Sequence, residues 1–132
     1  MENLASLMRR LRICEELGTG WDKMVISCEL FQLPAPKIDL YEENVKVTLF
    51  SKVSFSNLSL DEKLWACYLH TCVKYVQSEQ VTNQSLRARF GVDDKGTAGI
   101  SRLIREAVKR RLIKPLDPTT APRHMKYVPF WA

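Results

Sequence analysis

The stretch GISRLIREAVKRR, Gly99–Arg111, decides how the fold is predicted, because it combines a regular apolar stripe with many basic residues. Apolar residues recur at offsets 0, 3, 4, 7, 8 and 12 from Ile100, which places them on one side of a helix. At about 100° per residue, Arg102, Arg105 and Lys109 fall on the opposite side. We therefore expect an amphipathic helix that buries one face and exposes a ridge of three cations.

The residues before this stretch predict a shorter helix and a tight turn. Thr82 is a suitable N-cap for a helix over Asn83–Phe90, since its side-chain oxygen can accept from a free backbone N–H. Gly91 follows where a helix end favours a left-handed residue, and the next helix begins near Thr97. Two short helices joined by a tight turn, the second one basic, have the layout of a helix-turn-helix.

The residues after the stretch predict a β-hairpin. Leu112–Leu116 and Met125–Trp131 are the expected strands, and the proline-rich Asp117–His124 is the loop between them. A helix-turn-helix followed by a hairpin with a basic tip is the order of elements in a winged helix.

A long helix is expected upstream of these elements. Ser59 is its predicted N-cap, Glu62 completes a capping box, and the helix continues to about Gln77. Its predicted buried face consists of Leu64, Trp65, Tyr68, Leu69, Cys72, Val73 and Val76.

The N-terminal part predicts two helices and a hairpin. The helices are expected at Leu4–Glu16 and Trp21–Phe31, and the prolines of Leu33–Pro36 then impose an extended path. The alternation over Val45–Leu49 is typical of a half-buried strand, and Ile38–Tyr41 is its expected partner. The whole chain is predicted to have an α+β fold, with one unit at 1–52 and a winged helix-turn-helix at 59–132.

Charge is distributed unevenly along the chain. Residues 1–80 contain 9 Lys and Arg against 11 Asp and Glu, whereas residues 81–132 contain 11 against 4. The net charge of +5 therefore comes from the C-terminal part. Such an asymmetry favours a surface on that part that faces a polyanion.

We therefore expect the C-terminal unit to bind double-stranded DNA, with three groups of contacts. Residues expected to enter the major groove are Thr97, Ser101, Arg102 and Arg105. Residues expected to contact phosphates are Arg87, Arg89, Lys95, Lys109 and Arg110. Residues of the hairpin loop expected to reach an adjacent backbone or minor groove are Arg123, His124 and Lys126.

Two alternatives remain open at this point. In the first alternative, the C-terminal unit mediates protein interaction or homodimerisation, and the basic ridge is an ordinary solvated helix face. Several aromatic residues would then form a partly exposed patch. Those residues are Trp65, Tyr68, Phe130 and Trp131. The other alternative is a remnant nucleotide site at Gly18, Thr19 and Gly20, which on local grounds are better explained as a turn.

Other classes of protein are not favoured. No apolar run approaches the roughly 18 residues of a membrane span, and a cytoplasmic location is expected. The four cysteines (Cys14, Cys28, Cys67 and Cys72) form no CxxC pair and are expected to be reduced. Cys67 and His70 can share a helix face, but Cys72 points elsewhere, so no metal site is expected. We find no constellation for catalysis and expect no enzyme activity and no cofactor.

Two separate parts of the chain resemble one family in order and spacing. The segments LRICEELGTGWDKMV, CELFQLPAPKI and VKVTLF resemble the end of the GHKL-type ATPase domain in bacterial transcriptional regulators labelled RecG-related. The segments TNQSLRARFGV, ISRLIREAVKRRLIKPLDP and KYVPFWA resemble the winged helix that follows in those proteins. That family usually places a Schlafen/AlbA-type domain first, and the resemblance implies a DNA-binding module of a transcriptional regulator.

The resemblance also sets an expectation about ATP. Gly18, Thr19 and Gly20 match the family's glycine motif, but the helix and acidic motif that hold Mg²⁺ and adenine lie outside this sequence. We therefore expect residues 1–52 to be structural, in a piece or a short relative of a longer regulator, with ATP bound only in a longer parent protein. The target sequence, the effector and the sign of regulation do not follow from these residues.

Overall fold

The computed structural model describes residues 4, 7, 10, 11 and 20–132. Over this part the chain has an α+β fold with four α-helices and two small antiparallel sheets, as expected. The helices are α2 (Gly20–Leu30), α3 (Leu60–Val76), α4 (Asn83–Phe90) and α5 (Thr97–Lys109). The strands are β1 (Lys37–Leu40), β2 (Val45–Thr48), β3 (Ile113–Pro115) and β4 (Tyr127–Pro129). Short 3₁₀ turns are η1 (Phe55–Asn57), η2 (Asp94–Gly96) and η3 (Pro122–His124).

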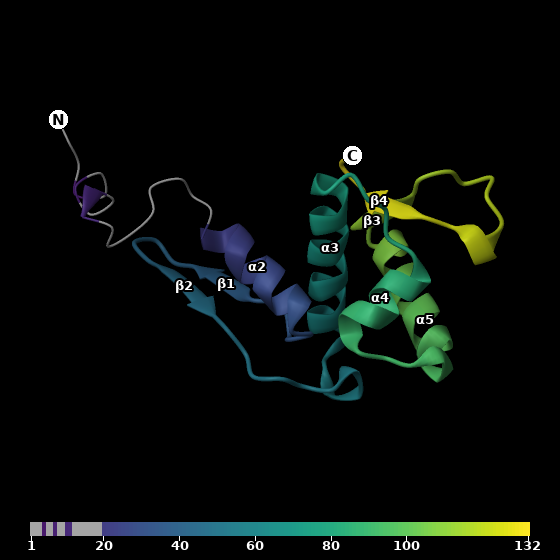
Figure 1. Ribbon diagram of the computed structural model, residues 1–132, viewed down its shortest axis with the longest axis horizontal. Coiled ribbons are helices and arrows are strands. Elements are labelled where there is room, and N and C mark those ends of the chain that lie inside the picture. The colour runs from purple at the N-terminus through teal and green to yellow at the C-terminus, as the bar shows by residue number, and fades with distance from the viewer. Residues whose placement is uncertain (1–3, 5–6, 8–9, 12–19) are drawn as a thin grey trace.

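Helix α3 lies in the middle of the molecule (Figure 1). Helix α2 and the β1–β2 hairpin lie on one side of it, and α4, α5, β3 and β4 lie on the other. The main core joins α3, α4, α5 and β3, with Leu86, Ile100 and Ile113 fully buried. A second core cluster joins Val25 and Ala35 to Ala66 and Leu69, so the two predicted units share a hydrophobic contact.

The predicted start of α3 is confirmed. The Ser59 side chain accepts a hydrogen bond from the Glu62 backbone N–H, and the Glu62 carboxylate accepts one from the Ser59 N–H. This capping box satisfies two backbone donors that would otherwise have no partner, which explains why the helix begins here.

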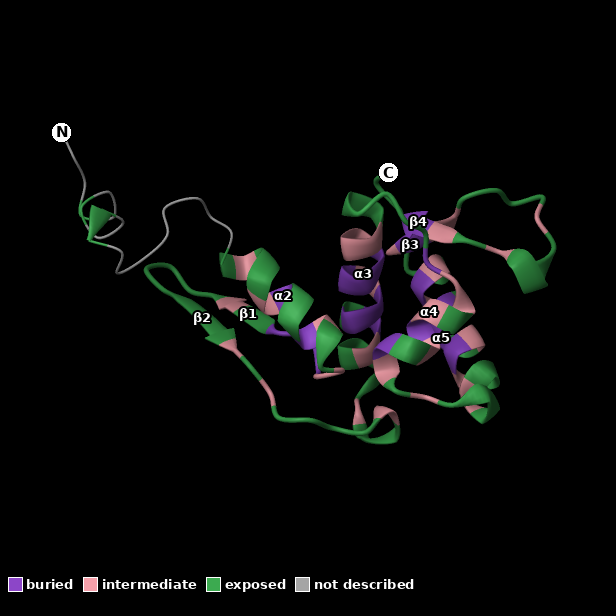
Figure 2. Ribbon diagram, viewed as in Figure 1, coloured by how far each residue is buried: buried purple, intermediate pink, exposed green. Residues whose placement is uncertain are grey.

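The predicted buried face of α3 was wrong in part. Trp65 and Val76 are exposed, with 38% and 78% of their surface accessible, whereas His70 and Thr71 are buried. Helix α3 packs against α5 on one side and against α2 on another, so it buries more than one stripe. Figure 2 shows its buried residues gathered in the middle turns of the helix.

The β1–β2 hairpin has the predicted strands but not the predicted burial. Ile38 pairs with Val47 and Leu40 with Val45 in an antiparallel register. Val45 and Val47 are nevertheless exposed, and most of the hairpin is coloured as exposed in Figure 2. Neither core cluster of the described residues draws a member from these strands, so no core of the described part covers their alternating apolar residues.

The segment predicted as a linker is anchored to the C-terminal core. Phe55 in η1 packs against the main cluster, and its ring meets that of Phe90 edge to face at 5.0 Å between centroids. Of the predicted helix Leu4–Glu16, only residues 4, 7, 10 and 11 are described, and the rest lies outside the described residues. Within the described part, no helix is both long and apolar enough to cross a bilayer.

Candidate nucleic-acid interface

Helix α4 has both predicted terminal signals. The Thr82 side chain accepts from the Ser85 backbone N–H at 3.1 Å, and the Ser85 hydroxyl accepts from the Thr82 N–H at 3.0 Å. Gly91 ends the helix with φ +65°, a left-handed conformation that glycine adopts without steric cost. The chain then turns within six residues and enters α5.

The turn between α4 and α5 is held by side chains and by close packing. The Asp93 carboxylate accepts from the Lys95 backbone N–H at 3.1 Å, and the Thr97 hydroxyl donates to the Asp94 carbonyl at 2.7 Å. A Cβ on Gly96 would lie 1.8 Å from Cγ1 of Val92, so only glycine fits beside this valine without a shift. Gly96 therefore serves internal packing within this turn.

Helix α5 has the predicted two faces. Ile100, Leu103, Ile104 and Ala107 are buried in the main core. The three cations of the predicted ridge, Arg102, Arg105 and Lys109, are exposed, as is Lys95 just before the helix. None of these four cations forms an ion pair with a carboxylate of the described residues.

Asn83 was not among the predicted site residues, yet it links α4 to α5. Its Nδ2 donates to the Ser101 hydroxyl at 3.0 Å and to the Thr97 carbonyl at 3.3 Å, while its Oδ1 accepts from Arg87 Nε at 3.0 Å. A polar residue in the first turn of the first helix is the only local signal for this contact. Asn83 thus fixes the two helices relative to each other.

The hairpin extends beyond the helices as an arm that carries three basic residues. β3 pairs with β4 in antiparallel register, with Lys114 opposite Val128, and the loop between them contains η3. Arg123, His124 and Lys126 are exposed on this loop. At its start, hydrogen bonds from the Thr119 hydroxyl and backbone N–H lower the pKa of Asp117, which closes a local turn.

A groove of about 950 Å³ lies between the helices and the hairpin arm. Arg105 of α5 lines it together with Arg123 and Lys126 of the arm, and no aspartate or glutamate lines it. Its other lining residues are Thr82, Asn83, Gln84, Arg87, Thr97, Ser101, Ile104, Val108, Pro115, Pro122, His124, Met125 and Tyr127. The structure thus brings Thr97, Ser101, Arg87, Arg105, Arg123, His124 and Lys126 together, whereas Arg102, Lys109 and Lys95 lie outside this groove.

Two of the predicted phosphate contacts are ion-paired within the chain. Arg87 pairs with Asp94, and Arg110 lies 2.8 Å from Glu106 and 3.2 Å from Asp61. Hydrogen bonding to Glu106, together with the carboxylate of Asp61, raises the pKa of the Arg110 guanidinium. A phosphate would have to compete with these carboxylates for both arginines.

The prediction that Arg89 contacts a DNA phosphate was wrong, because Arg89 is buried. Its side chain is 3% exposed and lies with its Nε 2.9 Å from Oε1 of Glu29, while a terminal nitrogen donates to the Leu33 carbonyl at 2.8 Å. Arg89 therefore does not reach the surface where a phosphate would bind. The sequence carries a signal for this, since Arg89 follows the buried Leu86 by three positions and so shares its helix face.

The structure gives no support for a metal centre in the part that it describes. No group of three or more His, Cys, Asp or Glu side chains is placed to hold a metal ion there. Cys28, Cys67 and Cys72 are free thiols, and burial raises the pKa of Cys67 to about 12. Cys14 lies outside the described residues.

The glycine motif is described only at its last residue. Gly18 and Thr19 lie outside the described residues, and Gly20 begins α2. A Cβ on Gly20 would meet nothing within 4 Å, so no close approach of another described element requires this glycine.

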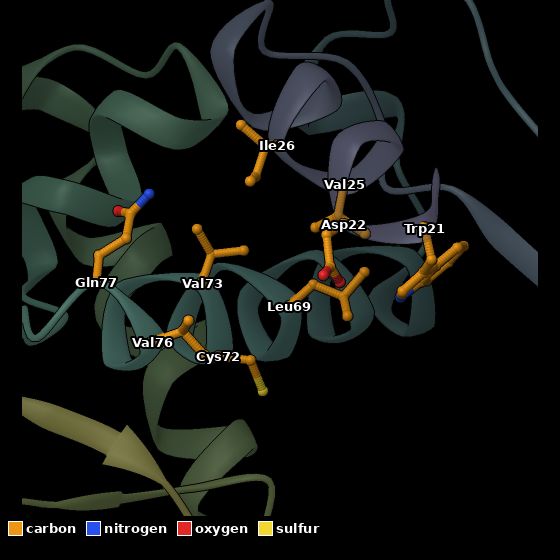
Figure 3. Close-up of a pocket in the computed structure, with 9 residues that line it drawn as sticks. All are labelled: Trp21, Asp22, Val25, Ile26, Leu69, Cys72, Val73, Val76 and Gln77. Carbon is orange, nitrogen blue, oxygen red and sulfur yellow. The ribbon is translucent and has the colours of Figure 1, made fainter. Parts of the chain in front are cut away.

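A second, apolar groove of about 220 Å³ lies between α2 and α3 (Figure 3). Leu69, Cys72, Val73 and Val76 of α3 line it together with Val25 and Ile26 of α2, and Trp21, Asp22 and Gln77 complete its lining. It lies on the face of α3 that was predicted to be buried.

Comparison with known proteins gives one match. Residues 2–49 are similar to a family model described as "Putative ATP-dependent DNA helicase recG C-terminal". This finding supports the expected RecG-related, ATPase-like segment, and it does not extend to α3, α4, α5 or the β3–β4 hairpin. No curated protein and no solved structure matches the chain.

Proposed function

We propose that residues 59–132 form a winged helix that binds double-stranded DNA, as the non-catalytic module of a bacterial transcriptional regulator. One observation carries the proposal: Arg105 of α5 and Arg123 and Lys126 of the hairpin arm line one groove that contains no carboxylate. Lys95, Arg102 and Lys109 add exposed positive charge beside it. The RecG-related segment at residues 2–49 is consistent with this setting.

The physical basis is attraction to the phosphate backbone. Cations on both walls of a groove neutralise phosphates and release condensed counterions, which supplies affinity without sequence preference. Arg102 and Arg105 are the residues best able to read a base edge, because a guanidinium pairs bidentately with guanine. We also propose a cytoplasmic location, where the three described cysteines would stay reduced.

Mapping of amide signals tests this proposal. Adding a random-sequence duplex at low salt is expected to shift the amides of α5 and of the Arg123–Lys126 loop, and to leave those of the β1–β2 hairpin unchanged. Duplex RNA and single-stranded DNA serve as separate arms that identify the preferred nucleic acid. The absence of any shift between Thr82 and Lys126 with every probe would refute nucleic-acid binding.

A second candidate function is homodimerisation, and a specific observation favours it. Phe130 and Trp131 are 45% and 59% exposed, and Trp65 is also exposed, which is the patch that an interaction module would present. Trp131 does pack on α3, since its Nε1 donates to the Tyr68 hydroxyl at 3.2 Å and its ring meets Tyr75 edge to face. These aromatics therefore hold the C-terminus to α3 while part of their surface stays open.

Sedimentation over a wide concentration range distinguishes this second function. A dimer that dissociates on dilution, and that is weakened by Phe130→Asp in the exposed aromatic patch, would support self-association. Ser51→Asp, the same added charge at an exposed position outside the patch, is the matched control. A monomer at every concentration removes this candidate and leaves DNA binding untouched.

A further inference from the structure

A buried cluster of three charged or titratable side chains joins α2, α3 and α4. His70 Nδ1 lies 2.5 Å from Oε2 of Glu29, and Arg89 Nε lies 2.9 Å from Oε1 of the same carboxylate. The side chains of Glu29, His70 and Arg89 are only 12%, 5% and 3% exposed. One carboxylate from α2 is therefore shared by one residue of α3 and one of α4.

Two further hydrogen bonds join the residues at the end of α2 to α4. Gln32 Nε2 donates to the Ala88 carbonyl at 2.7 Å, and Arg89 donates to the Leu33 carbonyl at 2.8 Å. Residues 29–33 therefore hold α4 at two successive positions, Ala88 and Arg89. His70 Nε2 also lies 3.4 Å from the Ser85 hydroxyl near the start of α4.

Such a cluster is better suited to fix geometry than to add net stability. Removing two charges from water costs several kcal/mol, and their attraction offsets this only in part here, because Arg89 Nε and Glu29 Oε1 form an ion pair but not an aligned hydrogen bond. The cluster therefore favours the arrangement of α2, α3 and α4 in which Glu29 reaches both partners. Arrangements that separate them leave a buried charge without a partner.

The arrangement of α4 matters because α4 holds α5. Asn83 at the start of α4 donates to Ser101 and to the Thr97 carbonyl of α5. Polar contacts thus join Glu29 to the end of α4, and other polar contacts join the start of α4 to the helix that carries Arg102 and Arg105.

We propose that Glu29 is a positioning residue for the nucleic-acid groove: through Arg89 and His70 it fixes α4, and with it the orientation of α5. The inference rests on the proposed function for its consequence in binding. The end of α2, in the RecG-related segment, would then contribute to binding although it lies outside the proposed DNA-contacting residues. Residues 2–49 would then act on the binding unit through a defined contact.

The variant Glu29→Gln tests this directly, because it keeps the shape of the side chain and removes its charge. Asp22→Asn is the matched control, an equal change of charge at an exposed position of the same helix. Electrostatics alone predicts that losing a negative charge strengthens binding to a polyanion. Positioning predicts the opposite for Glu29→Gln: affinity for duplex DNA falls by roughly 2- to 30-fold, while the slope of affinity against salt stays unchanged.

A second readout does not depend on DNA. Glu29→Gln is expected to shift amide signals in α4 and α5, including Asn83 and Ser101, whereas Asp22→Asn shifts are confined to α2. If the wild type binds no nucleic acid, the proposed function fails and these spectra still decide the positioning effect. A folded Glu29→Gln with unmoved α4 and α5 signals, or with affinity equal to that of Asp22→Asn, would overturn the proposal.

A conservative variant covers the case in which Glu29→Gln does not fold. Arg89→Lys keeps a positive charge beside Glu29 but cannot contact both the carboxylate and the Leu33 carbonyl with a planar guanidinium. We expect it to shift the same α4 and α5 signals. Spectra of Arg89→Lys that match the wild type beyond α4 would also overturn the proposal.

Discussion

Glu29 and Arg89 lie 60 positions apart in the chain, yet the Arg89 Nε is 2.9 Å from the Glu29 carboxylate in the interior of the protein. This contact connects the segment that is similar to the RecG-related family with the first helix of the proposed helix-turn-helix. It also removes Arg89 from the set of cations available to a phosphate. Of the predicted DNA contacts, the exposed cations without an ion pair among the described residues lie on α5, on the turn before it and on the hairpin arm.

Replacing Asn83 by Ala is expected to destabilise the protein by about 1–2 kcal/mol, because the change removes hydrogen bonds to Ser101, Thr97 and Arg87. Urea unfolding measures this. Gln84→Ala, one position further along the same helix and exposed, is the control and is expected to have a small effect. Equal effects of the two substitutions would show that the Asn83 contacts contribute little.

Replacing Gly96 by Ala is expected to cost about 1–3 kcal/mol, since the new methyl group would overlap Val92. The double variant Gly96→Ala/Val92→Ala removes the overlapping methyl groups of the valine. We expect it to be more stable than the sum of the two single changes predicts, as thermal or urea unfolding would measure. Simple additivity would contradict the packing described for this turn.

The Cys67 thiol is expected to resist alkylation in the folded protein. Burial raises its pKa to about 12, so the thiolate is on the order of 10⁻⁴ of the total at pH 8. Of the described cysteines, Cys72, which is partly exposed, should react first with iodoacetamide, and Cys67 should react only after unfolding in urea. Peptide mapping by mass spectrometry follows both sites, and equal rates in the native state would be inconsistent with this core.

Local signals were sufficient to predict the elements of the C-terminal part. The Ser59–Glu62 capping box, the Thr82 N-cap, Gly91 and the stripe that begins at Ile100 each act within a few residues, so the sequence displays them directly. The exposure of Arg102, Arg105 and Lys109 follows from the same periodicity.

Contacts between distant elements could not be predicted in this way. Glu29, His70 and Arg89 come from three helices, and no local pattern marks a shared carboxylate. The predicted burial of the β1–β2 hairpin was wrong for a related reason. Alternation predicts an apolar face, but only the tertiary structure decides whether another element covers that face. Helix α3 is apolar on several sides, so periodicity alone did not select the face that is buried.

A salt series of binding to random duplex DNA tests the central claim most directly. The wild type is compared with Lys95→Ala/Lys109→Ala, which removes two predicted phosphate contacts, and with Lys46→Ala/Lys52→Ala, a control that removes the same charge from exposed positions outside the proposed interface. We predict affinity that falls steeply with salt, with a slope reduced by about 1 for each lost phosphate contact in the first variant and unchanged in the control. Equal slopes in the two variants, or no binding by the wild type at low salt, would contradict the account and make the α5 ridge a solvated face.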